Sequence, residues 1–498
     1  MLTPKSEDDF QDAVVQDNQN QKGEKEGNMC TRVLRDRSKT KGPDYYGEFE
    51  MNITTIEPDN FNEAINGPDG PKWQEAIQDE LKSLEQNNTW KIMRKPNKCD
   101  VIDFKWVFKI QPDKMGIENR YKARLCAKGF QQKYGINYEE TFSPVVRYDT
   151  LRVMLAIAAE EDLEILQFDV KTAFLNGKLN EEVFMKIPEG LSVDKSVIAS
   201  VEYDKTSDSS MLVCKLNKAL YGLKQASRCW YNTFKTFLEK YNFRVCESDK
   251  SLYIGSMNGV KVYIVLFVDD DLVFSKEKES VFSCIELLKS RFEITVSEAK
   301  TFVGVQILRD RKNKRIFLHQ INYVNNIVKR FNIQNAHPVA VPMENKLQLD
   351  NSNSCEKDLP FREIIGSLMF LTSVTRPDIS YSVHYLSRFL TCFNDAHWQA
   401  AKRVVKYLLA TRDHGIMYEG GNECKSKFVG YSDADFASDV VTRRSTSGYV
   451  FVMSGGPISW SSQRQGLTAL STFESEYIAA CETVKEAVWL NRLLSDIV

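Results

Sequence analysis

Apolar positions along most of this chain recur with the periods of helices and strands. Trp73, Ile77, Leu81 and Leu84 lie three or four residues apart behind Pro71, which predicts a helix that begins near this proline. By the same criteria, helices are expected at 150–160, 225–240 and 277–290, and strands at 104–109, 121–128, 165–168 and 301–319. A turn is expected at 113–116. This mixture predicts an α+β fold.

The two ends of the chain have a different character. Residues 1–60 are polar and carry 8 Lys+Arg against 13 Asp+Glu, so they are expected to be disordered. Residues 320–415 have a mainly helical pattern with breaks at Pro338–Pro342 and Pro377. Beyond Gly420 the pattern predicts three strands and then a last helix, at 427–432, 447–453, 457–460 and 473–494.

The most informative segment is an apolar run, 262–268, that leads directly into Asp269, Asp270 and Asp271. An apolar run resumes after them, which predicts a buried strand, a tight turn and a returning strand with the acids at the tip. Adjacent carboxylates raise each other's pKa unless a cation neutralises them. Mg²⁺ is a natural partner because it binds one or two carboxylates together with substrate phosphates. An acidic turn without function is the plain alternative.

Asp169 also follows a predicted strand. Alone, it could simply cap a turn or a helix. Together with Asp269 and Asp270 it places three acids at the ends of two strands that could be neighbours. If they converge, they could hold two metal ions about 3.5–4 Å apart, an arrangement that stabilises both oxygens of an in-line phosphoryl displacement.

Further segments make a resemblance specific. The chain resembles the reverse transcriptase and adjoining RNase H region of Pol polyproteins from copia-type LTR retrotransposons, from about Trp73 onward. The matching segments, in order, are 105–109, 120–130, 140–147, 168–177, 219–226, the acidic hairpin, 375–379 and 443–449.

The resemblance implies a polymerase with palm, fingers and thumb in a right-hand architecture, followed by a partial RNase H-like fold. Fingers and palm would occupy 71–320, a helical thumb and connection 321–425, and the RNase H-like part 426–498. The implied activity is RNA-directed DNA synthesis with Mg²⁺ or Mn²⁺, an RNA template, a DNA primer and dNTPs.

The family's metal-binding catalytic carboxylates match Asp169, Asp269 and Asp270. Phe174 matches the bulky residue beside the sugar of the incoming nucleotide, where a ring would exclude a 2′-hydroxyl; a core aromatic is an equal alternative. Lys122 and Arg124 share one strand face and could reach the triphosphate, although a solvated face explains them as well.

Two further segments match nucleic-acid contacts of the family. Tyr221, Gly222 and Lys224 correspond to the segment under the templating base pair, where glycine permits close backbone approach. Phe302 and Gly304 correspond to the primer grip, for which a tight strand turn is the alternative.

In the RNase H-like part, Asp433 and Glu474 match the first two carboxylates. Ser471 and Glu474 also form a capping-box pattern, so Glu474 has a structural alternative. The strand that carries the family's third carboxylate has no match here, so RNase H activity is not expected, and the three strands and one helix leave a sheet edge uncovered.

Two rival functions remain open: an inactive nucleic-acid-binding relic of a retrotransposon Pol, and a metal-dependent nuclease that uses Asp433 and Glu474. The relic is motivated partly by Asp271, which stands where the family usually has an apolar residue. Asp271 is expected either to loosen the hairpin by repulsion or to stay solvated at its tip.

Composition adds little to this picture. The net charge of −2 hides −5 in residues 1–60 and +3 in the rest, so a nucleic-acid surface would have to be local. The eleven cysteines show no C-x-x-C spacing, which disfavours zinc and disulfides. The N-terminus has no signal-peptide core, and no apolar run reaches the roughly 20 residues of a membrane span. A cytoplasmic (virus-like particle) or nuclear location is expected, and so is association with other Pol products or a second chain.

Overall fold

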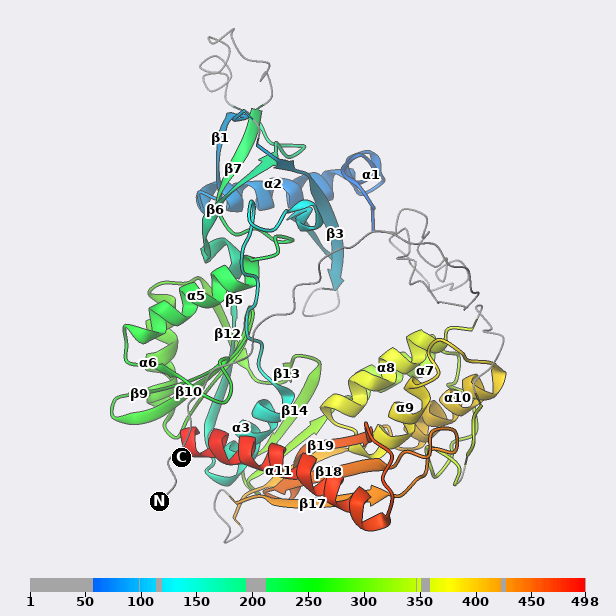
Figure 1. Ribbon diagram of the computed structural model, residues 1–498. Coiled ribbons are helices and arrows are strands. Elements are labelled where there is room, and N and C mark those ends of the chain that lie inside the picture. Colours follow the sequence, from blue (N-terminus) through cyan, green and yellow to red (C-terminus); the bar gives the residue numbers. More distant parts are fainter. Residues whose placement is uncertain are drawn as a thin grey trace, which may run out of the picture. The chain divides into compact units, whose positions relative to one another are not determined.

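The computed structural model describes residues 57–97, 99–112, 119–193, 212–345, 347–350, 359–421 and 427–497 (Figure 1). Disorder is expected for residues 1–60; residues 1–56 and the expected turn at 113–116 lie outside these ranges, whereas residues 57–60 are described and Asn60 caps the first helix. The described part belongs to one unit that starts at Glu57. Helices and strands are both present, which confirms the α+β class. Within the described residues, no helix combines the length and apolar character needed to cross a lipid bilayer.

The first elements are two helices and two small sheets. Helix α2 has Pro71 in its first turn, as predicted, and it buries Trp73, Ile77, Leu81 and Leu84. These side chains share a core with one face of the hairpin β3–β4 and with the sheet of order β1-β7-β6-β2. The elements are α1 (Phe61–Asn66), α2 (Gly70–Gln86), β1 (Trp90–Arg94), β2 (Val101–Ile102), β3 (Phe104–Pro112), β4 (Asn119–Ala127), η2 (Gly129–Gln131), η3 (Ala173–Asn176), β6 (Lys178–Lys186) and β7 (Leu212–Lys218).

A six-stranded sheet of order β12-β5-β11-β10-β9-β8 forms the centre of the unit. Side chains that alternate along its strands enter two separate cores. One core includes helices α5 and α6, and the other includes α3. The elements are α3 (Tyr148–Glu160), β5 (Glu164–Val170), α5 (Ala226–Glu239), β8 (Arg244–Val245), β9 (Leu252–Met257), β10 (Val260–Phe267), β11 (Asp270–Ser275), α6 (Lys278–Lys289) and β12 (Ile294–Glu298).

After the central sheet, the chain forms a four-stranded sheet of order β13-β14-β15-β16 and a cluster of helices. The helices share a core of their own, and the break at Pro377 is the start of a short 3-10 helix. The elements are β13 (Thr301–Phe302), β14 (Val305–Asp310), β15 (Arg315–His319), α7 (Ile321–Arg330), α8 (Phe361–Val374), η4 (Pro377–Ile379), α9 (Ser380–Ser387), α10 (Asp395–Ala410) and β16 (Gly415–Glu419).

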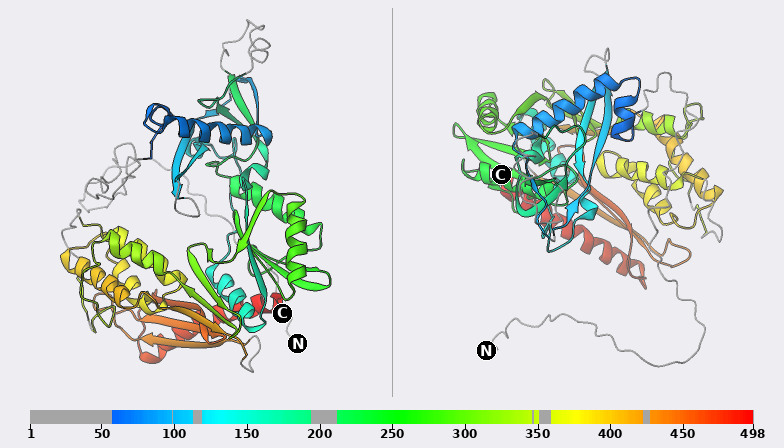
Figure 2. Two further views of the ribbon diagram at one scale, coloured as in Figure 1. Left: turned by 180° about the vertical axis from the view of Figure 1, so that it is seen from behind. Right: turned by 90° about the horizontal axis from the view of Figure 1, so that it is seen from above.

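The C-terminal part consists of the three strands and one helix that the sequence predicts. Strands β17 (Val429–Asp435), β18 (Thr446–Met453) and β19 (Gly456–Arg464) pair in that order, so β17 is an edge strand in this sheet. Helix α11 (Thr472–Ile497) lies along this sheet, as the views in Figure 2 show.

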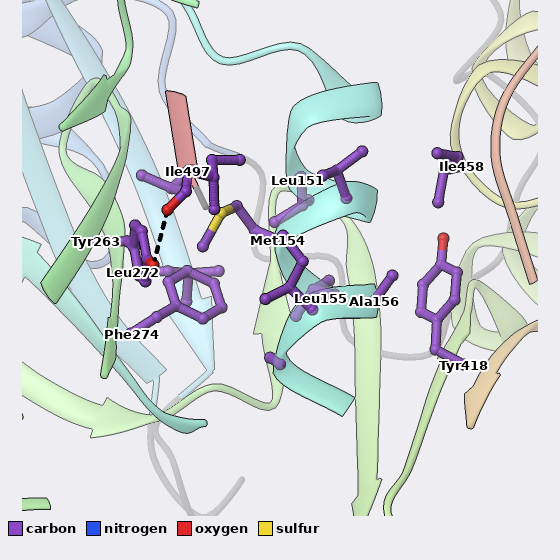
Figure 3. Packing of buried hydrophobic residues seen from close by; sticks show 14 of the residues in the cluster. Leu151, Met154, Leu155, Ala156, Tyr263, Leu272, Phe274, Tyr418, Ile458 and Ile497 are labelled. Atoms are coloured by element: carbon purple, nitrogen blue, oxygen red, sulfur yellow. Dashed lines mark hydrogen bonds between the residues drawn. The ribbon is translucent and has the colours of Figure 1, made fainter. Parts of the chain in front are cut away.

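The end of α11 packs into the same core as α3. Leu490, Leu493 and Ile497 are buried in this core, and the Tyr263 hydroxyl of β10 donates a hydrogen bond to the Ile497 carbonyl (3.1 Å; Figure 3). From the other side of α3, Tyr418 and Ile458 complete the core (Figure 3). The segment expected as RNase H-like therefore shares its hydrophobic core with the central sheet.

Candidate functional site

Two acids that are distant in the sequence stand directly opposite each other in the central sheet. Strands β5 and β11 are antiparallel, and their register pairs Asp169 with Asp270. Residues that face each other across such a pair project on the same side of the sheet, with Cβ atoms about 4.5–5.5 Å apart. The backbone N–H of Val170 also donates to the Asp269 carbonyl (2.8 Å), which ties the end of β5 to the turn before β11.

The turn between β10 and β11 consists of Val268 and Asp269. Val268 has a φ of +65°, a conformation that is strained for a β-branched residue. Its carbonyl accepts a hydrogen bond from the Trp230 indole N–H of α5, which helps to hold the strained backbone. This hydrogen bond and the one to the Asp269 carbonyl hold the turn in place, with Asp269 next to the Asp169–Asp270 pair.

The electrostatics of the pair favour a bound cation. Partial desolvation raises the pKa of Asp169 although its side chain stays exposed, and the Asp269 charge raises it further. Burial likewise raises the pKa of Asp270, while a hydrogen bond from Gln167 opposes this shift. A cation placed between these carboxylates would relieve their repulsion.

The donor set suits a divalent ion that brings further ligands with it. Among the described residues, no group of three or more His, Cys, Asp or Glu side chains is placed so that it could hold a metal ion, so the three predicted acids do not form a metal site by themselves. Asp169 and Asp270 nevertheless provide two carboxylates on one face. Mg²⁺ binds in this way, through one or two carboxylates plus water and substrate phosphates. The site thus fits a metal that arrives with a phosphorylated substrate.

Asp271 lies on the opposite face of the sheet from Asp169 and Asp270. It pairs with Phe168, is fully buried, and its Oδ1 accepts a hydrogen bond from the Phe267 N–H (2.8 Å). Its Oδ2 is buried without a hydrogen-bond partner, and burial raises its pKa well above the usual value. The expectation that Asp271 stays solvated at the tip is therefore wrong, because only Val268 and Asp269 form the turn and adjacent strand residues face opposite sides.

Two rings and a guanidinium lie in series near Asp169. The ring centroids of Phe174 and Tyr221 are 4.9 Å apart in an edge-on arrangement, and the Arg124 guanidinium lies 5.1 Å from the Tyr221 ring centroid. Phe174 is only partly buried, at the border of two cores. It is therefore positioned by the core without being enclosed by it.

Lys122 and Arg124 share the face of β4 that points away from the buried Ala123 and Leu125. Burial lowers the pKa of Lys122, and the neighbouring Arg124 lowers it further, whereas Asp169 acts in the opposite direction. Lys122 is therefore within electrostatic range of Asp169. The two cations are suitably placed for an anionic group near Asp169.

Gly222 passes very close to the end of β4. Its φ is +89°, and a Cβ atom there would lie 2.1 Å from the Ala127 carbonyl oxygen, so only glycine fits. Lys224 turns toward the segment after β4, where its Nζ contacts the Gln132 carbonyl (3.2 Å) and the Tyr138 hydroxyl (3.0 Å). The turn that contains Tyr221, Gly222 and Lys224 therefore packs against the end of β4, the strand that carries Lys122, and against the segment that follows β4.

The end of β13 and the turn that follows it contain the two residues matched to a primer grip. Phe302 is fully buried in the core, whereas Gly304 is exposed with a φ of +78°. Between them, Val303 has a φ of +46°, and its carbonyl accepts a hydrogen bond from the Tyr148 hydroxyl (3.2 Å). The buried ring anchors a strained turn whose backbone is accessible.

Sequence reasoning missed Gln167. Its side-chain Nε2 donates to Asp270 Oδ1 (2.6 Å) and to the Thr301 carbonyl (3.0 Å). The available signal was position: Gln167 lies two residues before Asp169 on a strand and so faces the same side.

The two RNase H-like carboxylates lie on different elements. Asp433 is exposed on β17 and pairs with Gly448. Glu474 lies in the first turn of α11, where its N–H donates to Ser471 Oγ (3.1 Å) and its Oε2 accepts from the Leu470 N–H (2.6 Å). Glu474 therefore has the capping role that its sequence pattern indicates.

Comparisons with known proteins show the family to which the chain belongs. The family model described as reverse transcriptase (RNA-dependent DNA polymerase) matches residues 87–345. The Retrovirus-related Pol polyprotein from transposon TNT 1-94 of Nicotiana tabacum is 39% identical over 452 residues, which is 89% of this chain and 33% of that protein. The corresponding polyprotein from transposon RE2 of Arabidopsis thaliana is 36% identical over 87% of this chain and 29% of its own length.

A shorter relative is covered almost completely. The putative transposon Ty5-1 protein of Saccharomyces cerevisiae is 32% identical over 64% of this chain and 99% of its own length. Among solved structures, the foamy viral protease-reverse transcriptase in complex with double-stranded DNA matches 84% of this chain and 60% of that one, with 11% identity and a TM-score of 0.42. The chain spans about a third of the two plant polyproteins. It belongs to the reverse transcriptase (RNA-dependent DNA polymerase) family of retrotransposon Pol polyproteins.

Proposed function

We propose that this chain is an RNA-directed DNA polymerase that extends a DNA primer on an RNA template. The observation that carries the proposal is the register that sets Asp169 opposite Asp270, beside the strained turn that presents Asp269. In the reaction, the primer 3′-hydroxyl attacks the α-phosphorus of a dNTP, a new P–O bond forms, and pyrophosphate leaves.

Asp169, Asp269 and Asp270 would hold Mg²⁺ or Mn²⁺ in this site. When bound, the ions would supply charge stabilisation for the attacking and leaving oxygens. The three carboxylates would hold the ions, and a bound cation would relieve the repulsion among them.

The remaining residues would bind and orient the substrates. Lys122 and Arg124 would contact the triphosphate, since both positive charges act on Asp169. Phe174, held edge-on by Tyr221, would lie against the sugar and exclude a 2′-hydroxyl. The backbone at Gly222, with Lys224 beside it, would support the templating base pair, and the turn at Gly304, anchored by Phe302, would contact the primer.

The RNase H-like part is proposed to have no nuclease activity of its own in this chain. Glu474 is engaged as a helix cap, and Asp433 lies on an edge strand. We further propose that the protein works in the cytoplasm, in virus-like particles, or in the nucleus, in contact with other Pol products or a second chain.

Primer extension by the full chain tests the proposal. An oligo(dT) primer on poly(rA), with dTTP and either Mg²⁺ or Mn²⁺, should be extended by the wild type. Asp169→Asn and Asp270→Asn should each lower the rate by at least about 100-fold, because each removes charge stabilisation at the reacting phosphate.

Asp310→Asn is a matched control, because Asp310 is an exposed strand residue outside the site. Its extension rate should equal that of the wild type. Wild-type rates for the Asp169→Asn protein would overturn the metal-binding assignment. A wild type that binds template–primer but adds no nucleotide with either metal would identify the chain as an inactive relic.

A further inference from the structure

One amide side chain joins the acid pair to the primer-grip turn. Gln167 is the β5 residue two positions before Asp169, on the same face of the sheet. Its Nε2 has two hydrogens, and it reaches Asp270 Oδ1 on β11 (2.6 Å) and the Thr301 carbonyl on β13 (3.0 Å). A single rigid group thus bridges the strand that bears a proposed metal ligand and the strand that leads into the turn.

The turn also affects Asp270 electrostatically. Burial raises the pKa of Asp270, and the backbone N–H of Val303 opposes this shift by favouring the charged form. Behind the turn, the buried Phe302 ring packs edge-on against Phe267, the last residue of β10, with ring centroids 6.4 Å apart. Displacement of the turn would therefore be transmitted through the Thr301 carbonyl and Gln167 to the Asp270 carboxylate.

The chemistry of an amide suits this position. A hydrogen bond to Oδ1 restrains the rotation of the Asp270 carboxylate and leaves Oδ2 to face a cation. Ligating carboxylates are commonly oriented by such outer hydrogen bonds, and loss of the outer partner typically costs about 10–100-fold in metal affinity or activity. An amide is neutral, so it can orient the carboxylate without neutralising its negative charge. A Lys or Arg side chain in the same place would compete with the metal ion for that charge.

We propose that Gln167 is a positioning residue that orients Asp270 and couples it to the turn at 302–304. This inference rests on the proposed polymerase function, in which that turn contacts the primer. A primer seated on the turn would then fix the Asp270 carboxylate through Thr301 and Gln167, so that metal binding and primer placement support each other.

Gln167→Met is the principal test, because methionine keeps the length and volume of the side chain but cannot donate a hydrogen bond. In primer extension we expect kcat to fall about 10–100-fold and the Mg²⁺ concentration for half-maximal rate to rise. The melting temperature and the Kd for template–primer should stay close to wild type. Ser297→Ala is the matched control, since Ser297 lies directly opposite Gln167 on β12, and it should leave all four quantities unchanged.

A double-mutant cycle tests the coupling itself. Gly304→Ala strains a backbone with a φ of +78° and places a Cβ 3.0 Å from the Phe370 ring, so it should shift the turn and slow extension. If Gln167 transmits the position of the turn, Gly304→Ala should have a smaller effect in the Gln167→Met background than in the wild type. Effects that multiply independently would overturn the coupling.

The outcomes separate this inference from the proposed function. An active wild type with an unchanged Gln167→Met variant overturns only the role of Gln167. A Gln167→Met protein whose melting temperature falls with its rate, at an unchanged Mg²⁺ requirement, shows a merely structural residue and also overturns the inference. Should the melting temperature fall too far for kinetics, Gln167→Glu provides the same test, because its carboxylate cannot donate to Asp270 and repels it. An inactive wild type overturns both proposals.

Discussion

The buried carboxyl group of Asp271 accepts a hydrogen bond from the Phe267 N–H across the β10–β11 hairpin, 2.8 Å away. This contact joins the last residue of one strand to the second residue of the next. It therefore braces the turn of Val268 and Asp269 from the face opposite to the proposed metal site. The cost is a second carboxyl oxygen that is buried without a partner.

Replacing Asp271 by leucine should stabilise the protein. The change removes a buried, half-satisfied carboxyl group, whose burial costs about 1–3 kcal/mol, and it loses one hydrogen bond worth about 1 kcal/mol. We expect the apparent free energy of unfolding in urea to rise by about 1 kcal/mol. Asp271→Asn keeps the acceptor and should gain less. A leucine variant that loses more than about 1 kcal/mol would show that the bond to Phe267 dominates.

The contact between Phe174 and Tyr221 leads to a prediction about sugar selection. Phe174→Ala removes the ring proposed to exclude a 2′-hydroxyl, so rNTP incorporation should rise relative to dNTP incorporation by about 10- to 200-fold, the range for a steric difference in an apolar pocket. The measurement is the ratio of kcat/KM for rUTP and dTTP. Tyr221→Phe keeps the ring that supports Phe174 and should leave the ratio unchanged. An unchanged ratio in Phe174→Ala would favour the alternative of a core aromatic.

Local sequence patterns predicted most elements of the fold, because they depend on side-chain periodicity and turn chemistry. The helix behind Pro71, the acidic hairpin and the three strands followed by a helix at the C-terminus are examples. Contacts between segments that are distant in the sequence could not be predicted from such local patterns. The periodicity of the last helix gave no indication that Leu490 and Leu493 would enter the core of the central sheet.

Within the site, the sequence identified residue types but not their faces. Asp270 and Asp271 were both expected at the tip, and their separation onto opposite faces depends on a turn of only two residues, Val268 and Asp269. The proposed role of Gln167 depends on how closely β5 approaches β13. No local sequence pattern predicts that these two strands lie close together. Register and the approach of separate sheets are tertiary properties, so these features required the structure.

The shared core predicts that the C-terminal helix supports the polymerase fold. Leu490→Ala and Leu493→Ala should each lower the free energy of unfolding by about 2–5 kcal/mol, as expected for a buried leucine. Val488→Ala, on the exposed side of the same helix, should change it by less than about 1 kcal/mol. Primer extension after brief heating should show the same order of loss. If extension by the leucine variants survived heating as well as wild type, the helix would be dispensable to the central sheet.

The lowered pKa of Asp439 leads to a prediction about how the free energy of unfolding depends on pH. Burial alone would raise its pKa, but the Thr442 N–H and the Arg464 guanidinium outweigh burial and lower the pKa to about 2. Arg388 also contacts the carboxylate (2.9 Å). The pKa of Asp439 is lower in the folded protein than in the unfolded chain. Ionisation of Asp439 therefore stabilises the folded protein at every pH above the unfolded-state pKa. This contribution, about 2 kcal/mol, is lost as the pH falls from about 4 to 2.

Asp439→Asn should therefore be less stable than wild type at pH 7 by about 2 kcal/mol, and the difference should shrink toward zero as the pH approaches 2. Urea unfolding at a series of pH values measures the difference, which cancels the titration of carboxylates common to both proteins. Asp435→Asn, an exposed neighbour on β17, should unfold like wild type throughout. A difference that stays constant from pH 7 to pH 2 would contradict the ion pairs as its origin, because a defect of packing does not titrate.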